Sequence, residues 1–287
     1  MSIQRPLVVA FVLAVLVNGQ AALLSEVDGP APVGTAPVAS AVGPIPAALE
    51  RRPPALRAVP ELDVATTARW SVAVLDGPTG EVTTWGDPGA FDTASIVKVD
   101  IAVALLLRVQ DEDRGLTSVE RDLATRMITV SDNDATSTLF RAVGGESGLE
   151  AVNARLGVEG IDVPPGADWG LTRTTATAQV RLLQRVFAAD SPVSTEHRIW
   201  LQQAMTDVAP DQRFGVGAAA DDPATTPLKV GLLQRSTTGR WVVTSIGQVT
   251  TDGRPRFMAV LTEGSPTLAE GVALSDRLGA AAVAALT

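Results

Sequence analysis

The stretch FDTASIVKVDIAVALLL, from Phe91 to Leu107, decides how the rest of the chain is interpreted. It places one lysine, Lys98, three positions after Ser95 and inside an apolar run. The chain has 23 Lys and Arg residues, and only two of them, Lys98 and Lys229, are lysines. Arginine stays protonated in proteins, whereas a buried lysine can lose its proton. The two lysines therefore mark positions where arginine would not serve.

Ser95 and Lys98 lie three positions apart, so a helix would bring their side chains to one face. Burial lowers the pKa of a lysine, and the neutral amine can then accept the proton of a serine hydroxyl. The start of a helix also favours developing negative charge, because its N–H groups are unpaired. The spacing predicts a serine nucleophile with a lysine base, although Ser-x-x-Lys alone also fits a solvated helix face.

Two further stretches carry related chemistry. VSDNDAT brings Ser131, Asp132 and Asn133 together at the end of an expected helix, and PLKVG places Lys229 on an expected strand. Gly231 would let a substrate approach the strand backbone closely. The alternatives are a Ser/Asp/Asn helix cap and a surface lysine.

Strand patterns occur near both ends of the domain, with helical spacing between them, which predicts an α+β domain with one antiparallel sheet and a separate helical lobe. The expected strands are Trp70–Leu75, Glu81–Trp85, PLKVGLLQR, and a second hairpin that turns at Asp252 and Gly253. The expected helices are Ser95–Val109, Ser118–Val130, Ala135–Val143, Gly148–Leu156, Thr175–Ala188, Ser194–Asp207 and Thr267–Leu286.

In order along the chain, Ser95-x-x-Lys98, Ser131-Asp132-Asn133 and Lys229-Val230-Gly231 resemble the three motifs of the penicillin-recognising serine enzymes. Among these enzymes they are most like the class A β-lactamases. AVGGESGLEAVNARLG and RTTATAQVRLLQRV also resemble segments of that family, so the likeness covers essentially the whole domain. It implies the β-lactamase/DD-peptidase-like fold, an antiparallel sheet flanked by helices plus an all-helical lobe, with the active site in the cleft between them.

The resemblance implies four catalytic roles. Ser95 would be the nucleophile that becomes acylated, and Lys98 its general base or proton relay. Ser131 and Lys229 would carry the proton toward the leaving nitrogen and position the substrate.

It also implies the substrate contacts. Asn133 would bind the side-chain amide of the substrate, beside the strand residues Val230, Gly231 and Leu232. The backbone N–H groups of Ser95 and Leu232 would form the oxyanion hole.

The loop VEGIDVPPGADWGLTR departs from the class A pattern, in which a Glu and an Asn four residues later hold the deacylating water. Its acids are Glu159, Asp162 and Asp168, of which Glu159 and Asp162 are the candidate deacylation acids. Val163 stands where the Asn would be, and Arg173 stands where the family has an Asp. We therefore expect impaired deacylation.

Two further departures affect the cleft. The short connection VQDEDRGLTS replaces a longer family segment, which predicts a more open cleft. Val230 replaces a Thr or Ser whose hydroxyl helps to bind the carboxylate of the antibiotic. Arg235, Arg213 or Arg240 could supply a positive charge instead.

Composition excludes several kinds of site. The net charge of −9 argues against a nucleic-acid partner. The chain has no Cys and no Tyr, which removes disulfides, thiolate chemistry and tyrosine bases. His197 is the single histidine, so we expect neither a His-rich metal site nor any cofactor, and a His-based triad is a distant alternative.

The first residues predict export. Arg5 precedes the apolar run Leu7–Val17 and small residues follow, which is typical of a signal peptide over 1–21, with an uncleaved anchor as the alternative. Residues 22–60 are rich in Pro and Ala and are assigned to a linker, and residues 61–287 to the hydrolase domain. A secreted or cell-envelope protein, monomeric and without a stable membrane span after cleavage, is expected.

The predicted function is acyl transfer through an acyl-serine on an amide or ester, with β-lactam hydrolysis slowed at deacylation. The substrate would be a β-lactam or a molecule like a cell-wall peptide. A penicillin-binding sensor without turnover, or a D,D-peptidase acting on peptidoglycan stem peptides, are the alternatives.

Overall fold

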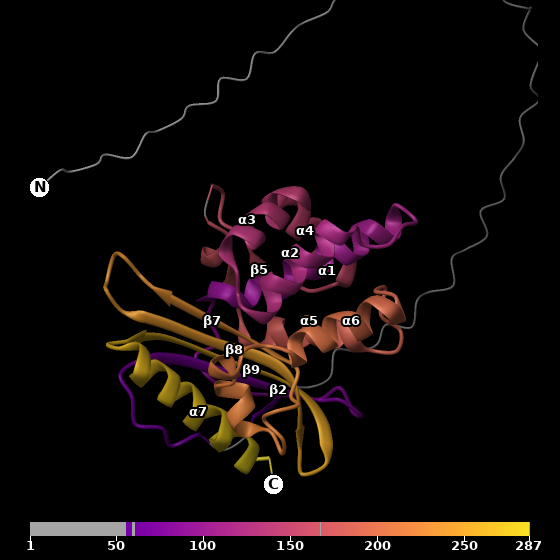
Figure 1. Cartoon of the computed structure of the whole chain (residues 1–287). Coiled ribbons are helices and arrows are strands. Elements are labelled where there is room, and N and C mark those ends of the chain that lie inside the picture. Colours follow the sequence, from indigo (N-terminus) through magenta and orange to yellow (C-terminus); the bar gives the residue numbers. More distant parts are fainter. Residues whose placement is uncertain (1–55, 59–60, 167, 287) are drawn as a thin grey trace, which may run out of the picture. The chain divides into compact units, whose positions relative to one another are not determined.

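The computed structural model describes residues 56–58, 61–166 and 168–286 (Figure 1). The predicted signal peptide and most of the predicted linker lie outside the described residues. Across the described ranges, no helix combines the length and the apolar character that a membrane crossing needs.

The sheet joins the two expected hairpins. Five antiparallel strands run in the order β3-β2-β9-β8-β7, and the short β1 lies parallel to β3 at the edge. Their bounds are β1 Leu56–Ala58, β2 Arg69–Asp76, β3 Val82–Gly86, β7 Leu228–Gln234, β8 Trp241–Thr251 and β9 Arg254–Ser265. The pairing of β2 with β9 brings together strands from opposite ends of the domain, which confirms the predicted α+β fold. β1 comes from the segment assigned to the linker.

Both faces of the sheet are covered. Helix α7 (Leu268–Ala284) packs on one face, where Leu274 and Leu278 join an apolar cluster with Val230 and Val260 (Figure 1). Helix α5 (Ala176–Phe187) packs on the other face against β2 and β9. Burial on both faces explains why the strands read as nearly continuous apolar runs.

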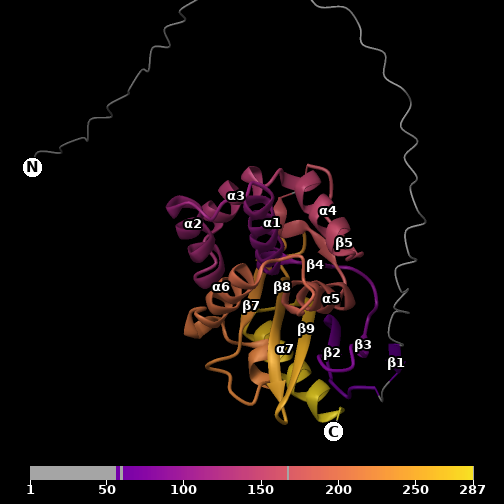
Figure 2. The same cartoon turned by 90° about the vertical axis from the view of Figure 1, so that its right-hand side faces the viewer.

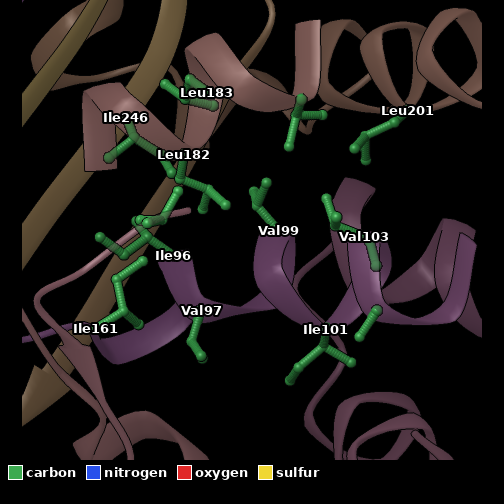
Figure 3. Packing of buried hydrophobic residues seen from close by; sticks show 14 of the residues in the cluster. Ile96, Val97, Val99, Ile101, Val103, Ile161, Leu182, Leu183, Leu201 and Ile246 are labelled. Atoms are coloured by element: carbon green, nitrogen blue, oxygen red, sulfur yellow. The ribbon is translucent and has the colours of Figure 1, made fainter. Parts of the chain in front are cut away.

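The helices between the hairpins form a lobe around α1 (Figure 2). Their bounds are α1 Val97–Asp111, α2 Ser118–Thr129, α3 Asn133–Ala142, α4 Gly145–Leu156 and α6 Thr195–Thr206. Figure 3 shows Val99 and Val103 of α1 pointing toward the helices that carry Leu183 and Leu201, whereas Ile101 points the other way. A helix that is apolar on all sides is a buried helix, and α1 is the core of this lobe.

All seven expected helices are present, and one boundary matters for the site. Ser95 lies in a 3₁₀ turn, η1 (Ala94–Ile96), and α1 begins only at Val97. A small three-stranded sheet lies next to this turn. Its central strand, β6 (Arg173–Thr174), pairs with β4 (Phe91–Asp92), which precedes Ser95, and with β5 (Ile161–Asp162), so β5 and β6 hold the two ends of the loop between them.

Candidate active site

Ser95 occupies a strained turn between the small sheet and α1. The preceding residue, Ala94, has φ of 48°, in the left-handed region that non-glycine residues seldom adopt. The carbonyl of Thr93 accepts a hydrogen bond from Thr244 Oγ1 at 2.8 Å, which ties the turn to β8. Such strain persists only where surrounding contacts impose it, and it is concentrated at functional sites.

Lys98 points from the first turn of α1 into a set of oxygen acceptors. Its Nζ donates to Ser131 O at 2.7 Å, to Asn133 Oδ1 at 2.8 Å and to Ser131 Oγ at 3.0 Å. In the described part of the chain, no hydrogen bond joins Ser95 to Lys98. The amine is therefore positioned by Ser131 and Asn133. The described residues contain no direct hydrogen bond between the side chains of Ser95 and Lys98.

The backbone of Ser131 accounts for this arrangement. Ser131 has φ of 57°, so it is a second non-glycine residue of the site in the left-handed region. This conformation lets both its carbonyl and its hydroxyl face Lys98. The next residue, Asp132, caps α3 by accepting from Ala135 N at 2.9 Å. The segment Ser131-Asp132-Asn133 therefore both caps α3, through Asp132, and holds the amine of Lys98, through Ser131 and Asn133.

Lys229 reaches the same hydroxyl from the sheet. Its Nζ donates to Ser131 Oγ at 3.1 Å and to Val230 O at 3.0 Å. The side chains of Lys98 and Lys229 are both completely buried. One serine hydroxyl thus lies between two buried amines, one from the helical lobe and one from the sheet.

The pKa values of both lysines are lowered. Burial lowers the pKa of Lys98 to about 8, with the carboxylate of Asp132 acting in the opposite direction. Burial also lowers the pKa of Lys229 to about 7, and repulsion from Lys98 contributes. Either amine can therefore be neutral near physiological pH, as a base or a proton relay requires.

Gly231 brings β7 against the nucleophile turn. A Cβ at this position would lie 2.4 Å from Thr244 Oγ1, 2.7 Å from Ser95 N and 2.8 Å from Thr93 O. No side chain fits there without displacing backbone. β7 is also an edge strand of the sheet, so within the described residues no strand pairs with the outer side of its backbone.

A cleft of about 550 Å³ opens over Ser95. It is lined by Ala94, Ser95, Asn133, Ser137, Asp168, Trp169, Gly170, Leu171, Leu232, Leu233, Gln234, Arg235, Ser236 and Thr237. These residues come from η1, α3, the loop before β6, the end of β7 and the turn that follows it. The cleft thus lies between the helical lobe and the sheet.

The loop before β6 places an aromatic ring, and no acid, next to Lys98. The ring of Trp169 has its centroid 4.8 Å from Lys98 Nζ, and Trp169 Nε1 donates to Ser137 Oγ at 3.2 Å. Of the acids in this loop, Asp168 lines the cleft, whereas Glu159 and Asp162 are exposed and are not among the lining residues.

Arg235 belongs to an ion-pair group at one end of the cleft. Its Nη1 lies 2.8 Å from Asp92 Oδ2, and Arg173 Nη1 lies 2.6 Å from Asp92 Oδ1. Asp92 is buried, so it holds both guanidinium groups in fixed positions. Of the three candidate arginines, Arg235 lines the cleft. Arg213 donates to loop carbonyls such as Pro223 O, and Arg240 to Gly264 O.

The structure brings most of the predicted site residues together. Ser95, Lys98, Ser131, Asn133, Lys229, Gly231 and Leu232 surround the cleft or its floor. It does not bring in the side chain of Val230, which is buried in the apolar cluster with α7. His197 lies on α6, where its Nδ1 is 3.1 Å from Gln110 Oε1. No group of acids and histidines in the described ranges is arranged to hold a metal ion.

Two residues of the site were missed at the level of sequence. Trp169, on the loop before β6, contacts Lys98 on α1. Asp92 forms ion pairs with Arg173 and Arg235, which are distant from it in the sequence. A tryptophan within a loop rich in Pro and Gly was an available signal for the first. No local pattern identifies the second.

The family comparison agrees with this geometry. A family model described as "Beta-lactamase enzyme family" matches residues 117–286. The matched range includes Ser131 and Lys229, and it begins after Ser95 and Lys98, which therefore lie outside it.

Similar proteins include "Putative lipoprotein LppW" of Mycobacterium tuberculosis and of Mycobacterium bovis, each 29% identical over 129 residues. These alignments span 45% of this chain and 41% of the relatives, less than half of their length.

Among solved structures, a class A β-lactamase of Bacteroides cellulosilyticus superposes with a TM-score of 0.64 at 20% identity, over 76% of this chain and 92% of that one. A β-lactamase of Chitinophaga pinensis gives 0.61 at 19% identity, over 75% and 94%. At these identities the likeness concerns the fold.

Proposed function

The chain belongs to the beta-lactamase enzyme family, and from this premise we propose that it is a serine acyl-transfer enzyme that forms an ester through Ser95. The observation that carries the proposal is the shared position of Lys98 and Lys229 on Ser131 Oγ, at 3.0 and 3.1 Å. A serine beside a neutral lysine is a recurrent nucleophile and base pair. The substrate is an amide or ester, for which a β-lactam is the natural probe.

In the acylation step, Lys98 in its neutral form takes the proton of Ser95, and Ser95 Oγ bonds to the substrate carbonyl carbon. The developing oxyanion is stabilised by the N–H groups of Ser95 and Leu232, a type of interaction that contributes about 3 kcal/mol per donor. The proton then passes through Ser131 to the leaving nitrogen as the C–N bond breaks. Lys229 orients the hydroxyl of Ser131 by donating to its Oγ.

Hydrolysis of the resulting ester is proposed to be slow. A base that activates water needs to lie within hydrogen-bond reach of that water. The two acids suggested by the sequence, Glu159 and Asp162, do not line the cleft, and the third acid of the loop, Asp168, lines it with an exposed side chain. The long-lived acyl-enzyme is consistent with either a slow hydrolase or a sensor that signals its acylated state.

We place the protein at the cell envelope or outside the cell. The apolar segment at Leu7–Val17 supports export. The relatives named lipoproteins support the same compartment.

The test is the intact mass of the protein over time after mixing with a chromogenic cephalosporin, with Ser95→Ala as the control. A lasting adduct on the wild type alone supports acylation with slow hydrolysis. Rapid release of product with only a transient adduct would show normal turnover and contradict the slow step. If neither β-lactams nor fluorophosphonates nor activated esters modify Ser95, the proposed function is wrong.

A further inference from the structure

The amine of Lys98 has no free side in this structure. Its three donor directions are filled by Ser131 O, Ser131 Oγ and Asn133 Oδ1. The remaining approach from the loop is covered by the ring of Trp169, with the centroid 4.8 Å from Nζ. Trp169 is partly buried and also lines the cleft that contains Ser95. The ring therefore lies between Lys98 and the solvent on the loop side.

The gap between Nζ and the ring is too narrow for water. A water molecule hydrogen-bonded to Nζ at about 2.9 Å and touching the ring carbons at about 3.5 Å would need roughly 6 Å in total. The observed separation of 4.8 Å is more than an ångström shorter. As long as the ring keeps this position, Lys98 cannot hold a water molecule on that side.

The ring is held in place from two directions. Its Nε1 donates to Ser137 Oγ on α3 at 3.2 Å. Its backbone carbonyl accepts from Thr172 Oγ1 at 2.7 Å and from Thr172 N at 3.2 Å, in the turn η2 (Trp169–Leu171). Because both the indole and the backbone are anchored, the ring does not need a bound substrate to stay over Lys98.

We infer that Trp169 is a positioning residue that keeps hydrolytic water away from Lys98 and so sets the lifetime of the acyl-enzyme. This inference rests on the proposed function and names the residue that makes hydrolysis of the acyl-enzyme slow. The acyl group then persists until a partner other than bulk water, or a movement of this loop, removes it.

The chemistry that Trp169 suppresses is ordinary ester hydrolysis. Water oxygen would bond to the acyl carbonyl carbon while one water proton passes to neutral Lys98. The bond between the carbonyl carbon and Ser95 Oγ would then break, and Ser95 would recover the proton from Lys98. No other reactant is needed. Because the three directions of the amine are taken by Ser131 and Asn133, the lone pair of neutral Lys98 becomes available to the water when the contact with Ser131 Oγ gives way into the space that the ring occupied.

The experiment compares wild type with Trp169→Ala and measures the acylation and deacylation rate constants separately, by following the adduct mass with a chromogenic cephalosporin. We expect Trp169→Ala to release the acyl group roughly tenfold to a hundredfold faster, a gain within the range of general-base catalysis by one group. The acylation rate constant should change much less. A residue with only a structural role would lower both rates together.

Three further variants keep the test decisive. Trp169→Phe retains a ring and should keep the long-lived adduct, whereas Ser137→Ala removes the indole acceptor and should give an intermediate release rate. Trp200→Ala is the matched control, because Trp200 packs on the same core away from the cleft-lining residues. Thermal melting of each variant identifies those that fold poorly, and Ser137→Ala carries the test if Trp169→Ala is one of them.

The outcomes separate the two proposals. An adduct that forms on all the folded variants and is released at the wild-type rate from Trp169→Ala and Ser137→Ala overturns the role of Trp169 alone. The absence of any adduct on the wild type overturns the proposed function, and the inference with it.

Discussion

The two sides of the cleft differ in how completely their polar groups are satisfied. On the acylation side, Lys98 and Lys229 are fully buried and each has oxygen acceptors at 2.7 to 3.1 Å. On the loop side, Glu159 and Asp162 are exposed, and the residue that reaches the lysine is an aromatic one, Trp169. Burying an amine is unfavourable unless it is paired, so the oxygen acceptors around Lys98 and Lys229 are what allow these side chains to be buried. On the loop side an aromatic ring covers Lys98, and the one loop acid that lines the cleft, Asp168, is exposed.

The change that should affect this comparison most is Lys98→Arg. Arginine keeps the charge but does not give up its proton, so the base is lost. We expect the acylation rate to fall by roughly 10²- to 10⁴-fold, the usual contribution of a general base. Stopped-flow acylation with a chromogenic cephalosporin measures the effect. Acylation within tenfold of wild type would mean that Lys98 is not the base.

Gly231→Ala tests whether the close approach of β7 belongs to the acylation side. The new methyl group would lie 2.7 Å from Ser95 N and 2.4 Å from Thr244 Oγ1, so the strand or the nucleophile turn has to move. A displacement of about 1 Å at a reacting group can reduce a rate by about 10²-fold, and we expect a loss of that size in acylation.

Gly239→Ala is the matched control for the substitution, because a Cβ at Gly239 meets no atom within 4 Å. Because Gly239 has φ of 68°, an alanine there strains the backbone and lowers the stability of the protein, but it does not alter the cleft. Equal acylation rates for the Gly231 and Gly239 variants would contradict the proposed packing.

The pH dependence of acylation distinguishes the two sides without a mutation. Acylation needs the neutral form of Lys98, whose pKa is lowered to about 8, whereas Lys229, with a pKa of about 7, loses its proton at lower pH. The rate should therefore rise about tenfold per pH unit below about 8 and level off above that pH. Because the amines share Ser131 Oγ, the observed midpoint belongs to the pair. A rate that stays constant from pH 6 to pH 9 would rule out either amine as the base.

The sequence was informative where the chemistry is local and uninformative where it is long-range. The spacing of Ser95 and Lys98, the tripeptide at Ser131 and the scarcity of lysine pointed to side chains that the structure gathers around Ser131 Oγ. The fold class followed from strand patterns at both ends of the domain and helical spacing between them. The position of the nucleophile in a 3₁₀ turn was missed, because Ala94 has positive φ only under constraint from β8.

The loop side could not be predicted in the same way. Searching it for a replacement acid gave Glu159 and Asp162, because a carboxylate was the chemistry expected there. The contact between Trp169 and Lys98 depends on how residues 157–172 fold over α1, and no spacing rule encodes that. The ion pairs of Asp92 with Arg173 and Arg235 link three distant segments and are equally invisible to local patterns.

Arg235 should give the smallest effect, and it tests whether substrate charge is recognised at the end of β7. Asp92 holds its guanidinium from behind, at 2.8 Å, so the group is oriented before a ligand arrives. Its side chain is 35% exposed, and a contact with a substrate carboxylate there is worth about 1 kcal/mol. Arg235→Gln should therefore acylate roughly fivefold more slowly with a penicillin that carries a free carboxylate.

The methyl ester of the same penicillin makes this test specific. The ester lacks the negative charge, so Arg235→Gln should slow its acylation much less. Arg240→Gln is the matched control, since Arg240 is exposed and donates to Gly264 O without lining the cleft. An equal loss for acid and ester would mean that Arg235 acts by fixing Asp92 and Arg173 at the base of the loop. The effect of Arg235 would then belong to the loop side of the cleft.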